Sequence, residues 1–197
     1  MSEPLSREQA WELFCEWTES SSLRKHVQAV EACMRAYAPR FGGDPEVWGL
    51  VGLLHDLDYE RYPSLETGHP RYALEELRRQ GFSEEFVRAV ASHADYLGVS
   101  RDSAMEKALY AVDELSGFVM ACAYVRPTGL EGMTAKSVKK KMKTPAFAAA
   151  VDRDGLREGA AELGVDFDEH VQFVIGALEP HAAELGLEPA PAPASDA

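Results

Sequence analysis

The side chains best suited to chemistry in this chain are histidines and aspartates in its first two thirds. The sequence has six histidines, and four of them lie between residues 26 and 93. His55 is followed at once by Asp56, and Asp113 lies in a later, largely apolar stretch. Imidazole nitrogens and carboxylate oxygens together suit borderline divalent ions such as manganese, iron, cobalt, nickel or zinc. These residue types therefore indicate a metal site.

The helical phase of these residues favours inward-pointing side chains. His26, His55, His93 and Asp113 each lie three or four residues from an apolar side chain in the same predicted helix. A carboxylate that faces a core is costly unless it is paired or bound to a metal ion. Taken singly, each histidine is better explained as a core residue that hydrogen-bonds a carbonyl. Taken together, they favour a site built by side chains that project inward from different helices.

The elements that must position these residues are helices nearly throughout. Serine caps, proline at first helical positions and apolar spacings of three and four residues predict the helix boundaries. Asp44-Pro45 is the clearest start signal, and His69 falls in a loop over residues 59–69. No alternating β pattern is present, so the predicted fold class is all-α. The expected helices cover residues 6–19, 21–37, 46–58, 70–80, 83–93 and 103–125.

The chain changes character after Pro127. A dense basic run occupies residues 136–143, and residues 145–163 predict one or two short helices broken at Gly155. An aspartate cap at 166 or 168 predicts a last helix through 185, kinked at Pro180. The expected organisation is a helical domain over 1–127, a helical extension packed on it over 128–187, and a disordered Pro/Ala-rich tail over 188–197.

Composition excludes several classes of partner. The net charge of −13 is unsuited to duplex nucleic acid or to an anionic membrane surface. The N-terminus has no basic region followed by an apolar run, so no signal peptide is expected. Three widely spaced cysteines without a CxxC motif predict free thiols in a reducing, cytoplasmic setting. An exposed face on the first helix could pair with a second copy of the chain, so a homodimer is compatible with the sequence.

The ordered motifs resemble one known family. The stretch LLHDLDYE, followed by GHPRYALEEL, AVASHADYLG and KALYAVDELSGF, is similar to the HD superfamily of metal-dependent phosphohydrolases, including its HDIG-type bacterial hydrolases. The resemblance covers about residues 23–127. It implies an HD-domain helical bundle with a C-terminal helical extension, and hydrolysis of a small phosphorylated molecule such as a nucleotide or another phosphate ester.

The resemblance also implies roles for individual residues. Asp56 would bridge two ions, and without His69 the site would hold one ion only. Asp56 and Asp58 are the expected catalytic residues, with Asp58 orienting ligands or moving protons from the same helical side as His55. The ions would be one or two of Mn, Fe, Co, Ni, Zn or Mg. The implied metal ligands are His26, His55, Asp56, His69, His93 and Asp113.

A phosphate substrate also needs positive charge beyond the metal ions. Arg61 and Arg71 flank the loop after the His-Asp pair, Arg126 ends a helix, and Lys140 lies in the basic run. These four residues are the candidate substrate-binding cations, although the basic run is also consistent with a solvated helix face.

Other functions stay open from the sequence. A similar set of ligands holds two irons in some HD-fold oxygenases. A regulatory module that binds metal without catalysis, or a structural helical protein without metal, would also fit. The substrate, the metal and the number of ions are not fixed by the residues alone.

Overall fold

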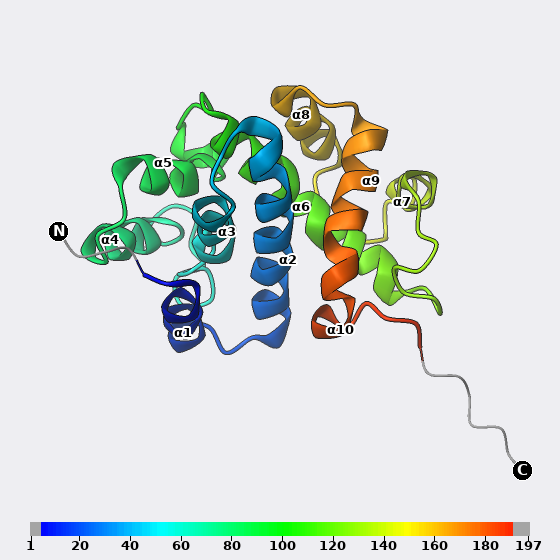
Figure 1. The fold of residues 1–197 in the computed structure, drawn as a ribbon, viewed down its shortest axis with the longest axis horizontal. Helices are drawn as coiled ribbons and strands as arrows, with labels where there is room; N and C mark the ends of the chain where they lie inside the picture. Colours follow the sequence, from blue (N-terminus) through cyan, green and yellow to red (C-terminus); the bar gives the residue numbers. More distant parts are fainter. Residues whose placement is uncertain (1–4, 191–197) are drawn as a thin grey trace, which may run out of the picture.

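The computed structural model describes residues 5–190, and within that range the chain forms helices and turns but no β-strand (Figure 1). The predicted all-α fold class is therefore confirmed. The helices are α1 (Arg7–Trp17), α2 (Ser21–Tyr37), α3 (Pro45–Leu54), α4 (Arg71–Arg79), α5 (Glu84–Ser92), α6 (Ala104–Tyr124), α7 (Ala135–Met142), α8 (Arg153–Leu163), α9 (Phe167–Leu178) and α10 (Ala182–Leu185). Three short 3-10 helices cover Ala38–Phe41, Asp95–Leu97 and Glu179–His181.

Local capping explains where these helices begin. Ser6 and Ser103 each form a capping box. The serine hydroxyl oxygen accepts from the backbone amide three residues later, and the side chain of that later residue, Gln9 or Glu106, accepts from the serine backbone amide. Ser83 caps α5, and Asp44 caps α3 with Pro45 at the first helical position. Each cap satisfies an amide that the first helical turn leaves without a partner.

Helix α2 lies at the centre of the fold. It packs against α3, α6 and α9, and Figure 1 places α3, α4 and α5 on one side of it and α9 and α7 on the other. The α3 backbone approaches closely at Gly52, where an added Cβ would lie 2.9 Å from the backbone nitrogen of Glu31. This close approach brings the C-terminal end of α3 alongside α2.

The C-terminal helices pack on the same core through a buried polar contact. His170 of α9 is fully buried, its Nδ1 lies 2.6 Å from the Tyr37 hydroxyl on α2, and its Nε2 lies 2.9 Å from the Ala111 carbonyl oxygen on α6. One neutral imidazole can satisfy both contacts by accepting from the hydroxyl and donating to the carbonyl. His170 therefore ties three helices together, whereas His181 is half exposed.

Two predicted boundaries are wrong. The third helix ends at Leu54 and not near residue 58, and the Gly52 carbonyl accepts a hydrogen bond from the His55 ring Nδ1 at 2.8 Å. Helix α8 runs unbroken through Gly155, because a helical glycine costs only about 1 kcal/mol relative to alanine. The sequence predicts a last helix through 185 with a kink at Pro180. In the structure α9 ends at Leu178, Pro180 lies in the 3-10 turn that follows, and α10 continues to Leu185.

The predicted tail lies largely outside the described residues, which end at 190. Within those residues, every helix is too short or too polar to cross a bilayer.

Candidate metal centre

The six histidines and aspartates of the predicted ligand set come together from five parts of the chain. His26 lies in α2, and Asp113 lies in α6. His55 caps the end of α3 and is followed by Asp56, while His93 caps the end of α5. The sixth member, His69, comes from the turn before α4. The fold therefore gathers side chains from helix ends and helix interiors at one place.

One group of ligand atoms forms around Asp113. The Asp113 Oδ1 lies 3.0 Å from the His26 Nε2 and 3.3 Å from the His55 Nε2. The Asp56 Oδ2 lies 3.8 Å and 3.5 Å from the same two nitrogens. Two imidazoles and two carboxylates thus face a common point.

A second group forms around the other oxygen of Asp56. The Asp56 Oδ1 lies 3.4 Å from the His69 Nε2 and 3.7 Å from the His93 Nε2. The two imidazole nitrogens are 3.1 Å apart. The two carboxylate oxygens of Asp56 therefore serve different groups, and its carboxylate lies between them.

In three of these histidines the Nδ1 atom, on the other side of the ring from Nε2, donates a hydrogen bond. The His55 Nδ1 donates to the Gly52 carbonyl, and the His93 Nδ1 donates to the Val90 carbonyl. The His69 Nδ1 donates to the Asp58 Oδ1 at 2.7 Å. A proton fixed on Nδ1 leaves the Nε2 lone pair free for a metal ion.

Asp58 is fully buried beside this centre and has both oxygens occupied. Its Oδ1 accepts from His69, and its Oδ2 accepts from the Ala73 backbone amide at 2.9 Å. A helix continued to residue 58 would place Asp58 on the same side as His55. Instead, turns follow α3 and bring the Asp58 carboxylate to the Nδ1 side of the His69 ring. This contact suits Asp58 to orienting that ring.

The electrostatics of the centre favour a cation. Burial lowers the pKa of His55, but the carboxylates of Asp56 and Asp113 raise it more, to about 9. Burial raises the pKa of Asp113, but His55 and His26 together bring it well below its usual range. Burial and the neighbouring His55 lower the pKa of His93. The Asp113 carboxylate therefore stays charged at neutral pH and attracts a positive charge.

The His55 Nε2 gives a direct test of whether a metal ion fits. It is buried and has no partner with hydrogen-bond geometry, although carboxylate oxygens lie nearby. Buried polar atoms are normally satisfied, so such an atom needs a ligand. Two sets of three residues could each hold an ion: His26, His55 and Asp56, and Asp56, His69 and His93. The residues present fit divalent metal ions.

A pocket of about 530 Å³ opens onto the centre. Three tyrosines and five carboxylates contribute to its wall, and among residues 5–190 no lysine or arginine does. The lining residues are Leu23, His26, Asp56, Tyr59, Leu65, His69, His93, Ala94, Asp95, Tyr96, Tyr110, Asp113, Glu114, Gly117, Val151, Asp152, Gly155 and Leu156.

The four predicted substrate-binding cations are not part of this wall, although Arg71 binds the backbone of the wall residue Leu65. Arg61 donates to the Glu16 carbonyl, and Arg71 donates to the Leu65 carbonyl at 2.9 Å. Arg126 holds the turn after α6 through carbonyls of that turn.

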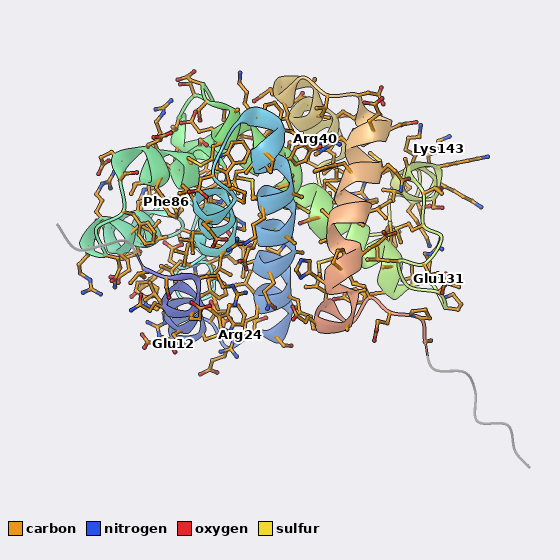
Figure 2. All side chains as sticks on the ribbon, in the orientation of Figure 1. Glu12, Arg24, Arg40, Phe86, Glu131 and Lys143 are labelled. Carbon is orange, nitrogen blue, oxygen red and sulfur yellow. The ribbon has the colours of Figure 1, made fainter. Side chains whose placement is uncertain are left out.

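Lys140 is exposed on α7, and Figure 2 shows side chains of this helix, with Lys143 labelled at its end, extending to the outside of the bundle. None of the four predicted cations reaches the described pocket wall.

Sequence reasoning missed several pocket residues. Tyr59 and Tyr96 each follow a ligand candidate by three residues, and Tyr110 precedes Asp113 by three, so ligand-relative spacing was the available signal. The Tyr96 hydroxyl donates to the His69 carbonyl at 3.0 Å. No comparable signal pointed to Asp152, because α8 reaches the pocket only through tertiary packing.

One family match covers the part of the chain that contains this centre. The HD domain family matches residues 23–117 of the chain. No curated protein and no solved structure matches the chain. The matched segment contains all six candidate ligands, while the α8 part of the pocket wall lies beyond it.

Proposed function

We propose that this chain, whose residues 23–117 belong to the HD domain family, is a metal-dependent phosphohydrolase that acts on a small phosphorylated molecule. The metal-dependent hydrolase superfamily follows from the domain and from the His/Asp centre. The phosphate ester as substrate is the finer proposal.

The position of Asp56 carries the proposal. Its Oδ2 faces His26 and His55, and its Oδ1 faces His69 and His93, so one carboxylate can bridge two ions. When bound, divalent ions supply a coordinated water of lowered pKa, about 7 in the best cases, and offset phosphoryl charge.

The residues of the chain contribute position and charge. Asp113 and Asp56 line the pocket and would hold the positive charge of the metal ions, and Asp58 fixes the orientation of the His69 ring. The pocket wall has no lysine or arginine within the described chain. The charge of a bound phosphate must therefore be neutralised by the metal ions.

We also propose a reducing, cytoplasmic setting. Cys15, Cys33 and Cys122 are free, and the last two are buried. Burial raises the pKa of the Cys33 and Cys122 thiols, which keeps them protonated and unreactive.

The test is phosphate release from a panel of nucleotides and phosphate esters, with manganese, cobalt, nickel, magnesium and iron added in turn. The double variant His55→Ala, Asp56→Ala removes a ligand of each group, and His181→Ala is the control because His181 is half exposed outside the centre. Release that the double variant loses and the control keeps supports the proposal. Absence of release from protein that retains iron would refute it, and oxygen consumption would then favour an oxygenase.

A further inference from the structure

The pocket wall has an unusual charge beyond that of the metal-ligand candidates. Besides the ligand candidates Asp56 and Asp113, the wall carries the carboxylates of Asp95, Glu114 and Asp152. The inference below rests on the proposed function of this site and names its substrate class.

Two of these carboxylates have no lysine or arginine partner among residues 5–190. Asp95 is paired with Arg101 at 2.5 Å, which offsets its charge. Glu114 and Asp152 form no ion pair within the part of the chain that is described. The Glu114 Oε2 accepts from the Asp152 backbone amide at 3.2 Å, which fixes the two residues side by side.

The wall is a ligand site on independent grounds. The His55 Nε2 is fully buried, lacks a hydrogen-bond partner and faces Asp56 and Asp113, whose side chains line the same pocket. Glu114 directly follows Asp113 in α6, so the unpaired carboxylates border the place where a ligand is needed.

Charge complementarity limits what can occupy this pocket. One phosphate can be neutralised at the metal centre, but further phosphates would lie against Glu114 and Asp152 with no lysine or arginine in the described wall. An ammonium group would instead pair with those carboxylates, and the aromatic rings of Tyr59 and Tyr96 in the wall also favour a cation, as the Tyr110 ring does for Arg101.

We propose that the pocket selects a phosphomonoester whose single phosphate faces the metal centre and whose other end carries an ammonium group against Glu114 and Asp152. Asp152 lies outside the matched HD segment, at the N-cap of α8. The C-terminal helices therefore contribute to the choice of substrate.

The first probe pair is 2-aminoethyl phosphate and propyl phosphate, which have the same chain length and differ in an ammonium or a methyl at the end. Because Glu114 and Asp152 are exposed, solvent screens their pairing with the ammonium, and two such pairs correspond to a roughly two- to tenfold preference in kcat/KM for the amine. A nucleoside triphosphate should be a poorer substrate than the corresponding monophosphate.

The second probe pair measures binding without turnover. It consists of 3-aminopropylphosphonate and butylphosphonate, in which a methylene replaces the ester oxygen. Titration calorimetry on metal-loaded protein should give a similar preference for the amine.

The variant Glu114→Gln, Asp152→Asn should lose most of this preference, and asparagine retains the ability to cap α8. Asp154→Asn is the matched control, because it removes one negative charge from the same helix turn outside the pocket wall. The control should keep the preference of the natural chain.

The outcomes separate this inference from the proposed function. Phosphate release with equal preference for both esters overturns the ammonium site and leaves the phosphohydrolase standing. An amine preference in calorimetry without any hydrolysis supports the ammonium site and counts against the phosphohydrolase. Equal binding of the two phosphonates overturns the inference whatever the activity.

Discussion

Replacement of Asp58 by asparagine tests how the second group of ligands is held. The Asp58 carboxylate accepts from His69 Nδ1 at 2.7 Å and from the Ala73 amide at 2.9 Å. Asparagine offers one acceptor and one donor group, so it can satisfy only one of these two donors. The change is nearly isosteric, and its effect therefore comes from hydrogen bonding.

Both orientations of the new amide are unfavourable. If its oxygen stays with Ala73, its NH₂ faces the His69 Nδ1, and the ring proton must move to Nε2. That proton would point at the Asp56 Oδ1, 3.4 Å away, and would block the nitrogen as a ligand. If the oxygen turns to His69, the Ala73 amide is buried against a donor, which costs about 1–3 kcal/mol.

The expected result is a roughly ten- to hundredfold loss of affinity for an ion held by Asp56, His69 and His93, the range found for partners that orient a ligand. The assay is competition against a fluorescent chelator, with the ions per chain counted by atomic emission and unfolding followed by circular dichroism. The exposed Asp154→Asn serves as control. Unchanged affinity and stoichiometry in the Asp58→Asn protein would refute the assigned role of Asp58.

Three further predictions concern stability. Gly52→Ala should lower the free energy of unfolding by about 1–3 kcal/mol in urea titrations, because its Cβ would meet the α2 backbone at 2.9 Å; Gly176→Ala, with nothing within 4 Å, should not. Burial lowers the pKa of His170 below its usual 6.5. The neutral, buried ring therefore contributes fully to the free energy of unfolding above that pH, and this contribution declines as the pH falls below it. Melting curves should show this decline in the natural chain and less of it in His170→Gln; identical curves would contradict the assignment. Arg101→Ala should lower the free energy of unfolding by about 1 kcal/mol, because it removes the partly exposed ion pair with Glu162 at 2.7 Å. Arg101→Lys should restore little of this stability, since lysine lacks the planar guanidinium group that can bind both carboxylate oxygens. Full recovery of stability in Arg101→Lys would contradict this role of the guanidinium.

The sequence determined the helices because their signals are local. Ser83 and Ser103 cap helices three residues upstream of the amides they bind, so the boundary is encoded within one turn. The ligand candidates were readable for a similar reason, since His55 and Asp56 combine a rare residue type with an apolar helix. The order of motifs gave the HD resemblance, which the family match over residues 23–117 confirms.

Tertiary structure decided which atoms meet and what surrounds them. The assignment of each Asp56 oxygen to a different histidine pair depends on where α2, α3 and α5 lie. The role of Asp58 depended on turns after Leu54, which a periodic pattern cannot foresee because they form where side chains compete for backbone carbonyls. Asp152 entered the pocket only because α8 packs on α6. Charge counts along the chain pointed to the basic run, but which charges reach a pocket is a matter of distance in three dimensions.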